Sequence, residues 1–120
     1  MPYADGFVVP IPKKNLATYR RIAAKAGKIW KEHGALEYRE CVADDLREMK
    51  GMGSFKKTHK LGAGDTVLFS WIVYKSRRHR DQVNAKVMKD PRLNAMMKPD
   101  AMPFDVKRML MGGFKVIVDP

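Results

Sequence analysis

Residues 66–74 read Thr-Val-Leu-Phe-Ser-Trp-Ile-Val-Tyr, and this stretch decides the fold. Side chains along a β-strand point alternately to the two faces of its sheet. One alternating set here contains Leu68 and Ile72, and the other contains Phe69 and Trp71, so both sets are mainly apolar. A strand with two apolar faces is typical of a sheet that is covered on both sides. The sequence therefore predicts a strand that is buried on both faces.

Two strands and a long helix are predicted before this stretch. Residues 7–9 form a short apolar strand, which Pro10 and Pro12 are expected to end, because proline favours the first turn of a helix. The helix that follows spans residues 13–32, with apolar side chains on one arc and lysine and arginine on the opposite arc. Residues 36–42 then alternate as a second strand, with aromatic and β-branched content.

A helix, a short turn and a last strand are predicted after residue 74. Ser76 is a suitable N-cap for a helix over residues 77–89, and Asp90 caps a further turn with proline in its first position. The last strand spans residues 108–118. Its adjacent glycines, Gly112 and Gly113, predict a bulge or bend there.

The resulting element order is βαββαβ, the ferredoxin-like pattern. We expect an α+β fold with an antiparallel four-stranded sheet and helices on one face, in a single domain over residues 1–120. Helices on one face leave the other face of the sheet bare. Because the strand over residues 66–74 is apolar on both sides, something else must cover that second face.

Composition indicates a soluble globular domain. The 120 residues are 45% hydrophobic and 31% charged, and the longest apolar run is too short to span a bilayer. The N-terminus has neither a basic segment nor a cleavage-site pattern, so we expect no signal peptide and a cytoplasmic location. Cys41 is the lone cysteine, which fits a reducing compartment, and the three histidines stand at no metal-ligand spacing from it. We expect no metal site and no membrane partner.

The charge is strongly basic, at +11 for the chain. Seven lysines and arginines and no acidic residue occur from Lys13 to Lys31, and a second basic cluster lies in the connection over residues 44–65. Such a surface attracts phosphate backbones and other polyanions. The alternative is a solubilising surface without a partner. Five residues are candidates for polyanion binding: Arg21, Lys25, Lys28, Lys56 and Lys57.

Three polar residues stand where the helical pattern expects apolar ones. His33 ends the apolar arc of the first long helix, and its imidazole suits proton transfer or ligand binding; the alternative is a cap on the helix C-terminus. Arg80 and Asn84 lie one helical turn apart and suit a carboxylate or carbonyl ligand. The alternative for Arg80 is that its stem packs on the sheet while its charge reaches solvent.

Large apolar side chains offer the walls of a pocket. Trp30, Trp71 and Met109 are candidate ligand-binding residues, and packing in the core is their alternative role. No nucleophile elbow, Walker loop, dinucleotide fingerprint or zinc-protease motif occurs in the sequence. The sequence therefore assigns no catalytic residue, and we expect no cofactor.

Several motifs taken together resemble the YbaA-like family of small bacterial proteins, over essentially the whole chain. They are Asp5-Gly6-Phe7-Val8-Val9-Pro10, Phe69-Ser70-Trp71-Ile72-Val73-Tyr74, Asp90-Pro91-Arg92, Ala101-Met102-Pro103-Phe104-Asp105, Lys107-Arg108-Met109 and Gly112-Gly113-Phe114. The family is a domain of unknown function, so the resemblance supplies no catalytic residues. It implies a dimeric α/β-barrel, in which two sheets pack face to face. Val106 and Met111 depart from the glycine and tyrosine that the family commonly has there.

Two functions from different classes follow. The first is a homodimer that binds a small anionic or aromatic molecule between helix and sheet, without assigned catalysis. The second is a basic adaptor that contacts RNA or another polyanion through the lysine- and arginine-rich face of the first long helix.

Overall fold

The computed structural model describes all 120 residues, apart from the side chain of Pro99. The secondary-structure elements in chain order are β1 (Tyr3–Pro12), a 3-10 turn (Lys13–Asn15), α1 (Leu16–Glu32), β2 (Glu37–Val42), α2 (Phe55–Thr58), β3 (Asp65–Tyr74), α3 (Arg77–Met88), α4 (Pro91–Met96), two further 3-10 turns (Pro99–Ala101 and Val106–Arg108) and β4 (Leu110–Lys115).

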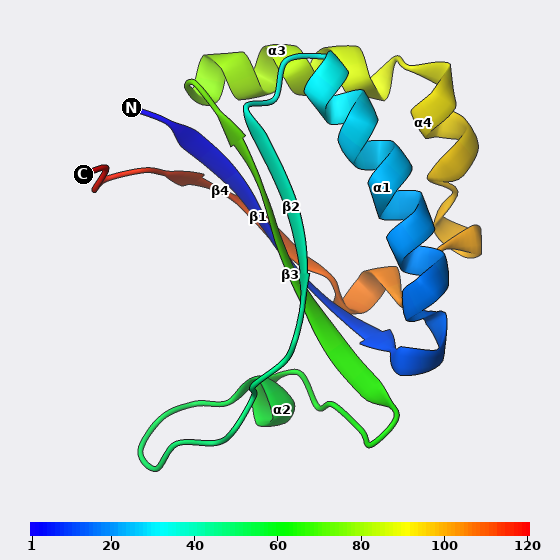
Figure 1. Cartoon of the computed structure of the whole chain (residues 1–120), viewed down its shortest axis with the longest axis vertical. Coiled ribbons are helices and arrows are strands. Elements are labelled where there is room, and N and C mark those ends of the chain that lie inside the picture. Colours follow the sequence, from blue (N-terminus) through cyan, green and yellow to red (C-terminus); the bar gives the residue numbers. More distant parts are fainter.

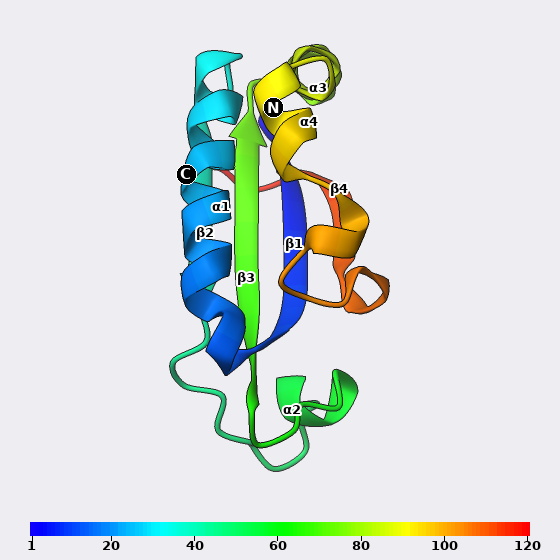
Figure 2. The same cartoon turned by 90° about the vertical axis from the view of Figure 1, so that its right-hand side faces the viewer.

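The four strands form one antiparallel sheet in the order β2-β3-β1-β4. Helices α1, α3 and α4 lie on one side of this sheet, and the connection that holds α2 projects past the end of β2 and β3 on the other side (Figure 1). In the view turned by 90°, α1 runs along one side of β3, and α3 and α4 lie towards the other side of β3 (Figure 2). The predicted α+β, ferredoxin-like architecture is confirmed.

The central strand β3 presents apolar side chains to both faces, as its sequence indicates. Leu68, Ile72 and Tyr74 are buried beneath the helices. Phe69 and Trp71 alternate with them and therefore lie on the face without helices, which we call the open face. Phe69 is 51% exposed there in the single chain. The second covering layer that the sequence predicts is thus not supplied by the chain itself.

Strand β1 is longer than the predicted residues 7–9 and does not stop before Pro10, so this part of the boundary prediction is wrong. The strand continues through Pro10, paired with Val67, to Pro12. Lys13 donates its backbone N–H to the Gly64 carbonyl on the β3 side. Pro12 and Pro10 lie one and three residues before Lys13, so by strand alternation their nitrogens face the opposite side. Strand β4 pairs with β1 only as far as Val8. Proline is tolerated because no neighbouring strand needs its missing donor.

Strand β4 is also shorter and more regular than the sequence predicts. Gly112 and Gly113 pair in unbroken register with Gly6 and Asp5, so the predicted bulge is absent from this described pair of strands. The glycine at position 113 has a different cause. A Cβ atom there would overlap the Tyr3 hydroxyl and lie 2.8 Å from Tyr3 Cε2, because the Tyr3 side chain crosses directly over the strand.

The helix ends follow the capping pattern in the sequence. The Ser76 hydroxyl accepts the backbone N–H of His79 at the start of α3, and the Asp90 carboxylate accepts that of Arg92 at the start of α4. Gly34 follows α1 with a φ of +116°, a conformation that glycine adopts without strain. These caps fix where the helices begin and end over the sheet. The core they enclose is in two clusters, one beneath α3 and α4 and one beneath the first turns of α1.

Candidate functional site

A pocket of about 120 Å³, partly open to solvent, lies between α1 and the sheet, and we call it the cavity. Its walls are mainly apolar and come from α1, from the first three strands and from the connection between α4 and β4. The lining residues that bear on its chemistry are Phe7, Tyr19, Trp30, Tyr38, Glu40 and Phe104. An apolar cavity with few polar groups is the usual form of a small-molecule site, although known sites are commonly about 300 Å³ or larger.

An open groove of about 870 Å³ runs along the outer side of α1, between this helix and the edge strand β2. Tyr19, Ala23, Tyr38 and Glu40 line both this groove and the cavity. These four residues therefore form the wall between the groove and the cavity. Any molecule that reaches the cavity from the groove must pass them.

The shared wall is held by a carboxylate that accepts two phenol hydrogen bonds. The Tyr19 hydroxyl donates to Glu40 Oε1 at 2.8 Å, and the Tyr38 hydroxyl donates to Glu40 Oε2 at 2.7 Å. Burial, with the charge and hydrogen bond of Glu40 as smaller causes, raises the pKa of both phenols well above their ordinary value of 10.0. Both phenols therefore keep their protons near neutral pH. We call this arrangement the Tyr-Glu-Tyr lock.

The local sequence explains how α1 and β2 come close enough to form the lock. Tyr38 and Glu40 are two residues apart on one strand, so both point to the face beneath α1. Gly27 in α1 lies directly against the Tyr38 ring, and a Cβ atom at Gly27 would be 2.8 Å from Tyr38 Cδ1. The Trp30 ring packs on Tyr38 from the next turn, with centroids 6.2 Å apart. The glycine thus makes room for the aromatic wall.

Three of the six predicted ligand-binding residues border the cavity, namely Trp30, Trp71 and Met109. Met109 also packs against the core cluster beneath the first turns of α1. Trp71 belongs to the open face by its position in β3, and its indole Nε1 donates to Glu37 Oε1 at 2.9 Å. Its ring also contacts Phe69, with centroids 5.6 Å apart.

Asn84 lies instead in a buried polar network beneath α3. Asn84 Oδ1 accepts hydrogen bonds from Trp30 Nε1 at 3.1 Å and from the Tyr74 hydroxyl at 3.2 Å. Asn84 Nδ2 is 3.5 Å from Asp5 Oδ2, at the limit of hydrogen-bond distance. The amide therefore joins α1, α3 and the two central strands.

Arg80 reaches the same carboxylate from one turn earlier in α3. Its Nη1 is 3.3 Å from Asp5 Oδ1, and its Nη2 is 3.3 Å from the Tyr3 hydroxyl. Its Nε lies 3.0 Å from Asp81 Oδ1, so the two groups form an ion pair. Their geometry is not that of a hydrogen bond, and Nε has no hydrogen-bond partner among the described residues. The Arg80 guanidinium and the Asn84 amide do contact a carboxylate, and this carboxylate is Asp5 of the same chain. A role for either residue in ligand binding stays a prediction.

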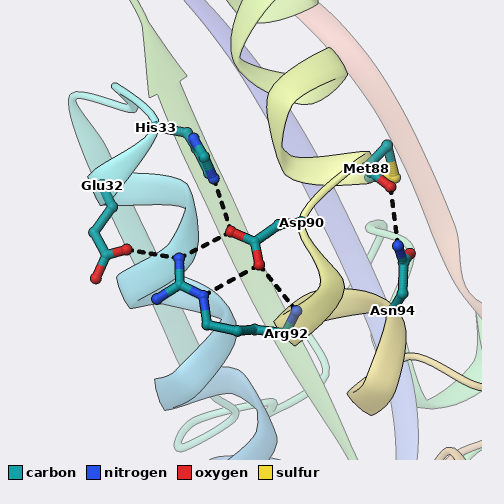
Figure 3. Close-up of polar contacts among 6 residues, drawn as sticks. All are labelled: Glu32, His33, Met88, Asp90, Arg92 and Asn94. Atoms are coloured by element: carbon teal, nitrogen blue, oxygen red, sulfur yellow. Dashed lines mark hydrogen bonds and ion pairs between the residues drawn. The ribbon is translucent and has the colours of Figure 1, made fainter.

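His33 is the C-cap of α1 and joins an ion cluster with the start of α4 (Figure 3). His33 Nε2 is 2.9 Å from Asp90 Oδ2, and Arg92 contacts both Asp90 oxygens, at 3.1 and 2.8 Å. Arg92 Nη2 also donates to Glu32 Oε2 at 2.7 Å. Hydrogen bonds from Arg92 and then from His33 hold the pKa of Asp90 below its usual range. The cluster ties α1 to α4, away from the cavity.

The five polyanion-binding candidates fall on two separate elements. Arg21, Lys25 and Lys28 are exposed on α1, whereas Lys56 and Lys57 are exposed on α2. Helices α1 and α2 lie on opposite sides of the sheet (Figure 1). The structure therefore does not bring the two basic groups together in one chain.

Tyr19, Tyr38 and Glu40 are the residues that sequence reasoning missed. Their spacing in the sequence could have indicated them. Tyr38 and Glu40 are two residues apart and so share one face of their strand, and Tyr19 belongs to the apolar arc of α1. A glycine in that arc, at position 27, indicates where the helix and an aromatic side chain approach closely.

The fold defines a small ferredoxin-like α+β protein, with a cavity between its first helix and its sheet. The chain belongs to the family described as "Protein of unknown function (DUF1428)", whose model matches residues 2–106. It is 44% identical over 119 residues to the uncharacterized protein YbaA of Escherichia coli K12, covering 99% of each chain. The relative in Shigella flexneri, also named uncharacterized protein YbaA, has the same identity and coverage.

Two solved structures share the fold at low sequence identity. One is an uncharacterized NIPSNAP domain protein from Burkholderia xenovorans, with a TM-score of 0.61, 13% identity and 98% coverage of each chain. The other is a dimeric ferredoxin-like protein from an uncultured marine organism, with a TM-score of 0.56, 14% identity and 100% coverage of each. Within the residues that the structure describes, no helix has the length and apolar character needed to cross a membrane.

Proposed function

We propose that this protein is a homodimer that binds a small molecule in the cavity between α1 and the sheet. The observation that carries the proposal is the cavity of about 120 Å³, with its apolar walls and its Tyr-Glu-Tyr lock. Its size suits a molecule of one aromatic ring, since an engineered apolar cavity of about 150 Å³ in another protein binds benzene.

Aromatic side chains support the choice of an aromatic ligand over an aliphatic one. Phe7, Trp30 and Phe104 contribute rings to the wall, and Tyr19 packs edge-on against Phe104 with centroids 5.8 Å apart. Ring pairs prefer offset or edge-on arrangements, which contribute about 0.5–1.5 kcal/mol beyond the area they bury. An aromatic guest would extend this packing.

The open face supports the homodimer. It exposes large apolar side chains from β3 and β4: Phe69 at 51%, Leu110 at 56% and Phe114 at 62%. Soluble monomers rarely leave a contiguous apolar patch of this kind uncovered. A second copy that packs its own open face here would bury it, as expected for two-layer sheet packing. The marine relative of this fold is described as dimeric.

A matched pair of alanine variants on α1 tests the ligand site. Ala26→Leu places added methyl groups in the cavity, whereas Ala17→Leu adds the same groups on the exposed side of the helix. Phenol, as the probe, should raise the melting temperature of the wild type and of Ala17→Leu but not of Ala26→Leu. No shift in the wild type with phenol or toluene at millimolar concentration would refute the site.

Charge substitutions on the two sides of the molecule test the dimer. Phe69→Asp places a carboxylate on the open face, and Met88→Asp places one at an exposed apolar position of α3. Sedimentation velocity should give a dimer for the wild type and for Met88→Asp, and a monomer for Phe69→Asp. A monomeric wild type at micromolar concentration would contradict the proposal.

Polyanion binding is the second candidate function. All seven lysines and arginines from Lys13 to Lys31 are exposed, and no acidic residue lies among them. If this face binds RNA, affinity should fall with salt at a slope of about −0.7 per phosphate contact. Replacing Arg21, Lys25 and Lys28 together with glutamine should flatten that slope. An unchanged slope, or no binding of the wild type at low salt, would end this candidate.

A further inference from the structure

The Tyr-Glu-Tyr lock bears on which molecules the proposed cavity accepts. Glu40 is the only carboxylate among the described residues of the cavity wall, and its two oxygens each accept one phenol proton. A carboxylate offers about four lone-pair positions, so each Glu40 oxygen keeps capacity for a second donor. We propose that the cavity selects small aromatic molecules that carry a hydrogen-bond donor, and that Glu40 accepts that donor. This inference rests on the proposed small-molecule site.

The protonation of the lock fixes the direction of its hydrogen bonds. Because the pKa of Tyr19 and of Tyr38 is raised above the ordinary value, both hydroxyls stay donors near neutral pH. Both donate to Glu40, so the negative charge of the site is concentrated on the Glu40 oxygens. A guest that reaches them must itself donate, as a phenol or an aromatic amine does. Hydrogen bonds to a charged acceptor are about twice as strong as neutral ones.

The same charge disfavours an aromatic carboxylate in the cavity. Like charges that are partly desolvated repel each other strongly. Arg39 is also among the lining residues, but its side chain lies on the open face, 62% exposed, and pairs with Glu37. The basic residues of the groove, Arg20, Lys28 and Lys31, are exposed on its outer side. Within the cavity wall, the Glu40 carboxylate is therefore the charged group that a ligand meets. We assign the cavity to aromatic molecules with a hydrogen-bond donor rather than to aromatic anions.

Three probes of similar size separate the classes: phenol carries a donor, toluene carries none, and benzoate is an anion. Calorimetric titration of the wild type should show phenol binding about tenfold or more tightly than toluene, the factor for one hydrogen bond to a charged acceptor. Benzoate should bind more weakly than either. The readout is the ratio of the phenol and toluene dissociation constants. If Glu40 has a purely structural role, a substitution at Glu40 would change both constants equally and leave the ratio as it is.

Two variants should move this ratio in opposite directions. Glu40→Gln removes the charge, so the ratio should fall towards one. Tyr38→Phe removes one donor and leaves a Glu40 oxygen free for the guest, so the ratio should rise. Glu48→Gln makes the same chemical change in the connection before α2, away from the cavity, and should leave the ratio as it is in the wild type. If Glu40→Gln does not fold, Tyr38→Phe still decides the question.

The outcomes separate the inference from the proposed site on which it rests. If no probe binds the wild type, the proposed small-molecule site and this inference both fail. If phenol and toluene bind alike, if benzoate binds best, or if neither substitution at the lock moves the ratio, the cavity binds ligands but the inference is wrong. Opposite shifts in the two variants, with an unchanged control, support it.

Discussion

The Gly27→Ala substitution should destabilise the protein, although alanine is the better helix former. In an open helix the change would stabilise by about 1 kcal/mol. Here the new methyl carbon would lie 2.8 and 2.9 Å from Tyr38 Cδ1 and Cε1, well inside contact distance. Overpacking a core position of this kind costs about 1–3 kcal/mol. Displacing the Tyr38 ring also weakens its 2.7 Å hydrogen bond to Glu40. Bonds to charged groups contribute about 1.5–3 kcal/mol.

With the helix gain of about 1 kcal/mol subtracted, the two losses give a net loss of about 1.5–5 kcal/mol in the free energy of unfolding. Urea unfolding followed by circular dichroism measures this value, at one fixed protein concentration because the stability of the proposed dimer would depend on it. The Tyr38→Ala background gives the sharpest control. Without the ring, the helix preference alone acts, so Gly27→Ala should stabilise that background by about 1 kcal/mol. A stabilising effect in the wild type, or the same sign in both backgrounds, would refute the reasoning.

Three further predictions concern buried charges and titrating groups. Asp5→Ala removes the buried carboxylate partner of Arg80 and leaves the guanidinium, 21% exposed, with the exposed Asp81 as its ion-pair partner. The change should cost about 1.5–3 kcal/mol in urea unfolding, and adding Arg80→Met should recover much of it; no recovery contradicts this. The pKa of Asp90 is lowered from 3.8 in the folded protein, so as the pH falls the unfolded chain protonates this carboxyl first. The stability that Asp90 contributes should therefore be present above pH 3.8 and be lost below it. Asp90→Asn should flatten this part of an acid-unfolding curve, and an unaltered curve counts against the ion cluster. Glu40→Gln should lower the pKa of Tyr19 and Tyr38, seen as earlier phenolate absorbance in an alkaline titration, and an unmoved titration would show that Glu40 does not act on them.

The order of elements could be predicted from the sequence because each element carries a local signal. The amphipathic period of α1, the caps at Ser76 and Asp90, and the alternation in β3 depend on neighbouring residues alone. The length of β1 could not be predicted in this way. Whether a proline is tolerated in a strand depends on which side its nitrogen faces, and this follows from pairing with distant residues.

The candidate site shows the same limit. Trp30 and Met109 were identified as possible wall residues because they are large and apolar. The lock escaped prediction because it joins Tyr19 in α1 to two residues of β2, and the distance between a helix and a strand is set by packing. Glu40 meets Tyr19 only because α1 packs over β2, and no local pattern in the strand indicates that contact.

The two prolines of β1 also decide how copies of this chain can meet. Beyond Val8, where β4 leaves, the border of β1 is free of a partner strand in the described sheet. Pro10 and Pro12 offer carbonyl groups along this border but no N–H, so an incoming strand would lack the donors it needs. Growth of the sheet by strand addition, the first step toward fibrils, is thereby blocked at this place. The open face stays available for the proposed dimer, and a face-to-face contact of this kind would join two copies and leave no open face for a third.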